Sequence, residues 1–199
     1  GRVHDERLLT RGAVLAIATP TAQAVAGVIT DVPILITAVT DPVAADLVDS
    51  LDRPGGNVTG TTDMNPVAEQ IALIKRVAPE ARSVGIIYSS GEVNSAIQVE
   101  LAKEAAALEG LEVVETTVAA STDVLQGVQG MNVDAIYVPT DNTVVSGLDS
   151  VIQVAEERQI PVIAGEADSV SKGALLTYGL DYYELGVQTG QMAVAILTE

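Results

Sequence analysis

Polar side chains that can bind a small charged molecule recur at the ends of the apolar segments of this sequence. They are hydroxyls, carboxylates and amides, which donate and accept hydrogen bonds. Because parallel strands end at a shared edge of a sheet, where open α/β proteins bind ligands, we expect these residues to line such edges. Taken singly, each is equally compatible with a plain helix cap. The set is Thr19, Thr40, Asp41, Asp63, Ser89, Ser90, Asn94, Ser95, Asp141, Asn142, Thr143, Glu166 and Asp168.

These groups suit a zwitterion better than a phosphate or a bond to be cleaved. Hydroxyls and free N–H groups at a helix N-terminus can hold an α-carboxylate. The candidates for this role are Thr19, Thr40, Ser89, Ser90 and Ser95. A ligand ammonium needs carboxylates, and Asp141, Glu166 or Asp168 could accept its protons. An aromatic ligand would need an apolar wall, which Tyr88 or Tyr178 could provide.

Covalent and metal chemistry have little support in the sequence. There is no cysteine, and the single histidine, His4, lies in a polar segment. Neither of the glycine-rich phosphate motifs of nucleotide-binding proteins is present. Glu166 and Asp168 could pass for an acid and base pair or for metal ligands, but no nucleophile with its own base accompanies them. We therefore predict no metal, no cofactor and no enzymatic activity.

Alternating apolar segments and helical patterns position these residues. Residues 34–39 read as a buried strand that ends at Thr40-Asp41-Pro42, and a helix with an apolar face is expected from Pro42 to about Leu51. Residues 1–12 could form a short helix. Such alternation predicts parallel sheets and an α/β fold. Further strands are expected at 13–18, 57–62, 83–88, 111–118, 133–139, 159–165 and 174–180, and further helices at 22–29, 66–78, 94–108, after 121–123, 144–158 and 182–197.

The acidic composition narrows the possible partners. The formal net charge is −17, so a basic nucleic-acid-binding surface and docking to anionic lipid are both disfavoured. No apolar segment is long enough to cross a membrane, and no signal peptide is visible.

Three ordered blocks resemble the substrate-binding proteins of a bacterial ABC-transporter family associated with tryptophan and related amino acids. They are AVTDPVAADLVDSLDRPGGNVTG at 38–60, VDAIYVPTDNT at 133–143 and DYYELGVQTGQMAVA at 181–195. The resemblance implies two Rossmann-like lobes joined by a hinge, as in type I periplasmic binding proteins. It places residues 1–62 and 174–199 in the first lobe and 63–173 in the second. It also implies that an amino acid of the aromatic class, such as tryptophan, binds between the lobes.

The same resemblance implies partners and a location. The partner would be the membrane permease of an ABC importer. The protein would be periplasmic or extracellular, attached through a leader or lipid anchor not present in this chain. Family members usually carry an opening β-α-β segment that we cannot match here, so the first lobe is expected to be incomplete. Its open sheet edge could pair with another copy.

Two other interpretations stay open on the sequence alone. One is a ligand-sensing regulatory module of the same fold, although no DNA-binding segment is present. The other is a small α/β enzyme with Asp141 and Glu166 as acid and base.

Overall fold

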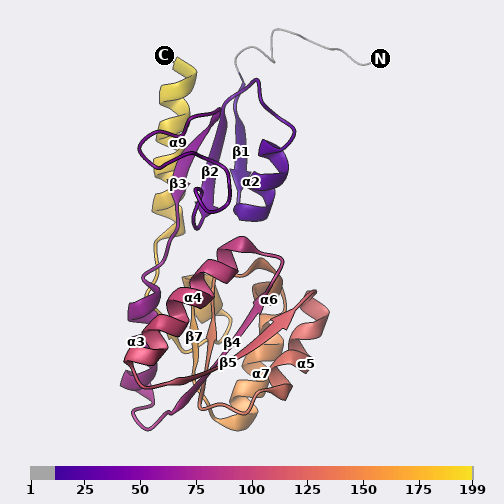
Figure 1. Cartoon of the computed structure of the whole chain (residues 1–199), viewed down its shortest axis with the longest axis vertical. Helices are drawn as coiled ribbons and strands as arrows, with labels where there is room; N and C mark the ends of the chain where they lie inside the picture. Colours follow the sequence, from indigo (N-terminus) through magenta and orange to yellow (C-terminus); the bar gives the residue numbers. More distant parts are fainter. Residues whose placement is uncertain (1–11, 199) are drawn as a thin grey trace. The chain divides into compact units, whose positions relative to one another are not determined.

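The computed structural model describes residues 12–198 of the chain. They form two compact units, each built around its own parallel sheet (Figure 1). Unit 1 contains the described residues up to Met64 and those from Asp181 onward, and unit 2 runs from Asn65 to Leu180. The short helix suggested for residues 1–12 lies outside the described residues, apart from Gly12. No helix in the described part of the chain combines the length and apolarity needed to cross a bilayer.

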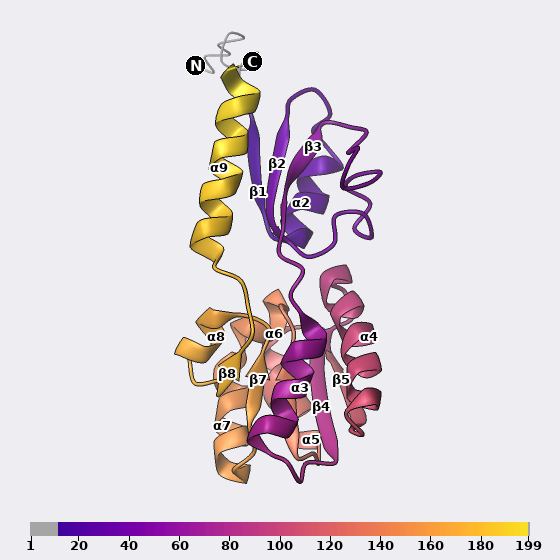
Figure 2. The ribbon, with the colours of Figure 1, turned by 90° about the vertical axis from the view of Figure 1, so that its left-hand side faces the viewer.

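The sheet of unit 1 has three strands in the order β1 (Val14–Ile17), β2 (Ile34–Val39) and β3 (Val58–Thr62). Helix α2 (Thr19–Ala26) covers one face, and α9 (Tyr182–Thr198) runs along the other (Figure 2). Pro20 lies in the first turn of α2, where its missing N–H costs nothing. The sequence therefore predicts the elements of this sheet well.

Helix α9 covers only part of its face of the sheet. It packs on β2 and β3, and its buried residue Thr189 places its Oγ1 2.7 Å from Oγ1 of Thr61 on β3. Beside it, Leu15 and Ile17 on the edge strand β1 are 58% and 55% exposed. Unit 1 thus keeps an apolar surface that its own described residues do not cover.

The helix expected from Pro42 to about Leu51 is wrong. Asp41 does cap a turn, because its Oδ1 accepts the N–H groups of Val43 and Ala44 at 3.0 Å each. The chain then leaves helical geometry at Asp46, whose φ is 56°, and continues as turns and bends. The apolar residues of this stretch do not form one buried face, because Leu47 is buried whereas Leu51 is 66% exposed.

The sheet of unit 2 has five parallel strands in the order β5-β4-β6-β7-β8. Its strands are β4 (Ser83–Ser89), β5 (Glu112–Val118), β6 (Ala135–Val138), β7 (Val162–Ala164) and β8 (Leu176–Thr177). Its helices are α3 (Val67–Val77), α4 (Val93–Leu108), the 3-10 turn η1 (Ser121–Asp123), α5 (Val124–Gly130), α6 (Asn142–Ser146), α7 (Leu148–Arg158) and α8 (Ala167–Ser171).

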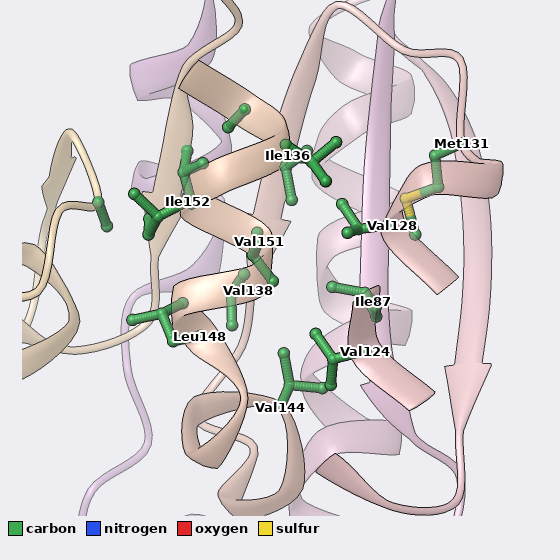
Figure 3. Close-up of a cluster of buried hydrophobic side chains, with 14 of the residues drawn as sticks. Ile87, Val124, Val128, Met131, Ile136, Val138, Val144, Leu148, Val151 and Ile152 are labelled. Carbon is green, nitrogen blue, oxygen red and sulfur yellow. The ribbon is translucent and has the colours of Figure 1, made fainter. Parts of the chain in front are cut away.

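Both faces of the unit 2 sheet are buried, because neighbouring strand residues point to opposite sides. Ile87 and Ile136 pack with α5 and α7 in one cluster, which Figure 3 shows in close-up. Ile86 and Tyr137 pack with α3 and α4 in the other. A sheet covered on both faces explains why its strands read as nearly continuous apolar runs.

Two expectations for unit 2 need correction. The helix expected over 144–158 is interrupted at Gly147, where a Cβ atom would lie 2.8 Å from the carbonyl oxygen of Ser121. The close approach of η1 therefore requires glycine and separates α6 from α7. The strand expected over 174–180 is reduced to β8, which pairs with β7 and so belongs to unit 2, not to unit 1.

Candidate functional site

Two sets of strand-end loops carry most of the predicted site residues. We call the loops after β4, β6 and β7 (residues 89–92, 139–143 and 165–168) the unit 2 rim. We call the residues that follow β1, β2 and β3 (18–19, 40–41 and 63) the unit 1 rim. Each rim is described on its own.

Asp141 holds two loops of the unit 2 rim together. Its side chain is fully buried; Oδ2 accepts the N–H of Ser89 at 2.6 Å, and Oδ1 accepts the N–H of Val144 at 2.7 Å. Burial raises the pKa of this carboxyl, and hydrogen bonds from Ser95, Ser89 and Val144 partly offset the effect. Asp141 therefore presents no exposed oxygen to a ligand ammonium in this structure.

Glu92, which the sequence reading missed, is the most heavily hydrogen-bonded carboxylate of the unit 2 rim. It accepts from the N–H groups of Asn142 and Thr143 at 3.1 and 3.0 Å, and from both of their side chains at 2.6 and 2.8 Å. Asn94 Nδ2 also donates to it at 3.3 Å. Burial alone would raise the pKa of Glu92, but these hydrogen bonds together lower it. No local pattern reveals this role, because most of the donors come from a distant loop.

Glu166 is also used as a helix cap. Its oxygens accept the N–H groups of Asp168 and Ser169 at 2.5 and 2.8 Å, and the Ser169 hydroxyl donates to it as well. The neighbouring Asp168 side chain, by contrast, is exposed. Of the three carboxylates predicted to bind an ammonium, Asp168 is the one with an accessible side chain.

The N-terminus of α4 has no side-chain cap. Ser89, Asn94 and Ser95 lie buried around it, whereas Ser90 is exposed. Asn94 Nδ2 donates to the carbonyl oxygen of Thr140 at 2.9 Å, while its buried Oδ1 has no hydrogen-bond partner. The N-cap residue of α4 is Glu92, so its carboxylate belongs to this N-terminus, near the exposed Ser90 hydroxyl and the loop that carries Asn142.

Three predicted residues of the unit 1 rim are buried. They are Thr19, Thr40 and Asp63. Asp63 accepts a hydrogen bond from the Tyr182 hydroxyl at 2.6 Å and another from the Thr40 hydroxyl. Burial raises the pKa of Asp63, and these hydrogen bonds oppose the shift. Asp41, which caps its own turn, is half-buried.

Strained backbone distinguishes the unit 1 rim. Ala18, the N-cap residue of α2, has φ 67° and ψ 153°, a conformation that is almost confined to glycine. Ala38 at the end of β2 has φ 52°. No side chain caps α2, so its first N–H groups are also available. Such strain persists only where the surroundings impose it, and it gathers at ligand-binding positions.

The two tyrosines considered as walls for an aromatic ligand differ in their surroundings. Tyr178 is 57% exposed, and its carbonyl oxygen accepts from Gln70 Nε2 at 2.8 Å. Tyr88, the other wall considered, donates its hydroxyl to Glu115 at 3.1 Å. No group of three or more His, Cys, Asp or Glu residues within 12–198 is arranged to hold a metal ion.

The sequence is similar to a known protein family and to individual proteins. The sequence matches the model of ABC transporter substrate binding proteins over residues 8–198. The tyrosine-binding protein of Clostridioides difficile (strain R20291) is 45% identical over 186 residues, which are 92% of this chain and 54% of that protein.

Two solved structures are similar over nearly the whole chain. One is the ABC domain in complex with L-Trp from Streptococcus pneumonia, and the other is a conserved domain protein from Vibrio cholerae. Each is 40% identical with a TM-score of 0.90, and the match covers 96% of this chain and 66% of that one. The chain therefore spans about half the length of the curated relative and about two thirds of these structures.

Proposed function

Because the chain belongs to the family of ABC transporter substrate-binding proteins, we propose that it binds an aromatic amino acid with residues from both of its units. The family resemblance read from the three sequence blocks is confirmed, as is the α/β fold with parallel sheets. A relative named for tyrosine and a structural neighbour bound to L-Trp support an aromatic ligand.

The observation that carries the proposal is the contrast among helix N-termini at the two rims. Carboxylates cap α6 and α8, and α4 begins at the carboxylate of Glu92, whereas α2 has neither a side-chain cap nor an acidic residue in its first turn. An N-terminus with free N–H groups attracts an anion, and a carboxylate already in place would repel it. We therefore assign the ligand carboxylate to α2 at the unit 1 rim.

The ammonium and the ring of the ligand need different partners. Asp168 is exposed, and the amide oxygen of the exposed Asn142 can accept a hydrogen bond from the ammonium, because Asn142 Nδ2 donates to Glu92 and so fixes the orientation of the amide. Tyr178 can provide an aromatic wall. The buried members of the predicted set would then hold the loops in place. They are Thr19, Thr40, Asp63, Ser89, Asn94, Ser95, Asp141 and Glu166.

A fluorescence titration with L-tryptophan tests the proposal. The chain contains no tryptophan, so the ligand's own fluorescence reports its binding without background from the protein. We expect saturable binding of L-tryptophan and displacement by L-tyrosine, but none by L-glutamate. Tyr178→Ala should weaken binding, and Tyr183→Ala, at a site 77% exposed on α9, should not. Absence of saturable binding for both aromatic amino acids contradicts the proposal.

We further propose that the protein binds its ligand without transforming it. The two carboxylates considered as acid and base, Asp141 and Glu166, both accept backbone N–H groups, which leaves them poorly placed to transfer protons. Incubation with each aromatic amino acid should return the ligand unchanged in its NMR spectrum. A new product that Asp141→Asn abolishes would favour the enzyme instead.

The proposed partner and location follow from the family. The ligand would be delivered to the membrane permease of an ABC importer, and the protein would be periplasmic or extracellular, attached to the membrane through a leader or lipid anchor. Co-purification of the protein with a permease from detergent extracts tests the partner. If the protein is absent from the extracellular and periplasmic fractions, the proposed location is contradicted.

We also propose that unit 1 pairs with another copy through its open edge. A groove of about 410 Å³ between β1 and α9 is lined by Leu15, Ile17 and Leu35 on the sheet and by Gly186, Gly190 and Ala193 on the helix. Light scattering should show a dimer that Ile17→Glu disrupts and Val28→Glu, at an exposed site away from the groove, preserves. A monomeric parent chain contradicts this pairing.

A further inference from the structure

Two carboxylates of the unit 2 rim each reach from their own loop to the neighbouring one. Glu92, in the loop after β4, accepts the N–H groups of Asn142 and Thr143 at 3.1 and 3.0 Å. Asp141, in the loop after β6, accepts the N–H of Ser89 at 2.6 Å. Because both carboxylates are buried and bind backbone groups, they hold the two loops in one relative position.

Glu92 also binds the side chains of the loop after β6. Asn142 Nδ2 donates to Glu92 Oε2 at 2.6 Å, and Thr143 Oγ1 donates to Glu92 Oε1 at 2.8 Å. Burial acts to raise the pKa of Glu92, but hydrogen bonds from Asn142, Thr143 and Asn94 lower it overall, so the group is a carboxylate at neutral pH. Since a carboxylate only accepts hydrogen bonds, an N–H of Asn142 and the hydroxyl hydrogen of Thr143 point toward Glu92.

The orientation of the Asn142 amide follows from this arrangement. If the amide were turned over, its Oδ1 would face Glu92, and two acceptors would meet with no hydrogen between them. With Nδ2 bound to Glu92, Oδ1 lies on the other side of the amide, and the Asn142 side chain is exposed. The hydrogen bond to the carboxylate also polarises the amide and strengthens its oxygen as an acceptor. Asn142 therefore offers an acceptor to a molecule at the rim.

Glu92 does not meet such a molecule itself. Its side chain is 7% exposed, and both of its oxygens already accept hydrogen bonds from Asn142 or Thr143. The influence of its charge on a ligand therefore passes through the Asn142 amide.

We propose that Glu92 is a positioning residue that makes the unit 2 rim selective for a ligand with an ammonium group. It holds the Asn142 amide with its oxygen toward the ligand. The inference rests on the proposed function, in which Asn142 accepts a hydrogen bond from the ammonium of an amino acid. A ligand of the same shape without the ammonium leaves this acceptor unpaired and binds more weakly. In Glu92→Gln, position 92 offers both a donor and an acceptor, so the Asn142 amide can take either orientation.

The first experiment compares two ligands that differ at the ammonium. They are L-tryptophan and indolepropionate, the same molecule with hydrogen in place of the ammonium, and their dissociation constants are measured from ligand fluorescence at neutral pH. We expect Glu92→Gln to weaken L-tryptophan about tenfold and indolepropionate by less than about twofold, because only the first ligand uses the oriented amide. The matched control Glu104→Gln, at an exposed site on α4, should change neither constant.

An equal loss for the two ligands in Glu92→Gln overturns the proposal. A purely structural role for Glu92 would disturb the rim as a whole and would weaken both ligands alike.

A second measurement uses the protein without any ligand. In NMR spectra, the side-chain NH₂ of Asn142 should exchange with water more slowly than that of Asn132, an exposed asparagine of the same unit, because Asn142 is bound to Glu92. Glu92→Gln should reduce this protection, and Glu104→Gln should not. Unchanged protection in Glu92→Gln overturns the proposal. Failure of the proposed function gives a different result, namely no binding of L-tryptophan while the protection depends on Glu92 as expected.

Asn142→Ala provides the test if Glu92→Gln does not fold. It removes an exposed side chain and keeps the backbone N–H that Glu92 accepts. L-tryptophan should again bind about tenfold more weakly and indolepropionate nearly as before. Asn132→Ala, the matched control, should weaken neither ligand. Parent-like binding of L-tryptophan by Asn142→Ala overturns the proposal.

Discussion

Unit 1 and unit 2 are each built around a parallel sheet, but the sheet of unit 2 is covered by helices more completely than the sheet of unit 1. In unit 2, helices cover both faces of a five-stranded sheet, and carboxylates tie the rim loops together. In unit 1, a three-stranded sheet keeps an exposed apolar edge, and its rim contains the strained Ala18. The comparison shows that unit 2 buries the apolar side chains of both faces of its sheet, whereas unit 1 leaves Leu15 and Ile17 exposed among the described residues.

The sharpest test of this difference deletes the same atoms from each sheet. Ile136→Ala in the fully buried core of unit 2 should lower the free energy of unfolding of that unit by about 2–5 kcal/mol, because it leaves a cavity. At a protein concentration at which the chain is monomeric, Ile17→Ala on the exposed edge of unit 1 should change stability by about 0.5 kcal/mol or less. Hydrogen exchange measured separately on peptides from each unit gives both values. Similar losses in the two units would show that the β1 edge is covered.

The second prediction concerns the carboxylates of the unit 2 rim. Asp141→Asn should destabilise unit 2 by about 1–3 kcal/mol. Both oxygens of Asp141 accept backbone N–H groups, and in the variant one of these N–H groups would face the amide NH₂, which cannot accept a hydrogen bond. Asp168→Asn, a matched change at an exposed carboxylate of the same rim, should have little effect on stability. Thermal unfolding followed by circular dichroism makes the comparison. Equal melting temperatures for the two variants would refute the structural role of Asp141.

Strain in the unit 1 rim predicts a stabilising substitution. Ala18→Gly should raise the stability of unit 1 by about 1 kcal/mol, because glycine adopts the observed φ of 67° without penalty. Ala24→Gly in the middle of α2 should lower it by about 0.5–1 kcal/mol. Exchange rates of α2 amides distinguish the two changes by sign. Destabilisation by both glycines would mean that Ala18 is not strained.

The smallest effect is a pH dependence. The folded-state pKa of Glu92 is lowered, so its contribution to stability is complete above the ordinary value of 4.5 and is lost as pH falls through the folded value. As pH is lowered below 4.5, the urea concentration at the unfolding midpoint should therefore fall more steeply for the parent protein than for Glu92→Gln. Parallel curves for the two proteins would argue against these hydrogen bonds.

The sequence predicts the elements of this fold better than its loops. The runs around Ile86 and Ile136 are buried on both faces and bounded by turn residues, so their periodicity and length identify strands directly. The helix expected after Pro42 fails because Asp46 leaves helical geometry, a choice made by packing rather than by spacing. The break at Gly147 depends on the approach of η1, which no local pattern reveals.

The candidate site shows the same limit. Polar strand ends can be read from the sequence, and hydrogen bonds within the unit 2 rim link Ser89, Asn94 and Asp141 to neighbouring loops. Which carboxylate caps a helix and which stays accessible depends on contacts across about fifty residues, as for Glu92 with Asn142. Sequence alone therefore proposed Asp141 and Asp168 as equals, although the structure buries one and exposes the other.

Amide chemical-shift mapping with L-tryptophan tests the central claim most directly. We predict shifts in the loops that carry Ser90 and Asn142 in unit 2, and at the start of α2 near Ala18 in unit 1. L-tyrosine should shift the same amides, and L-glutamate should not. Shifts confined to one unit, or to surfaces away from both rims, would contradict the account.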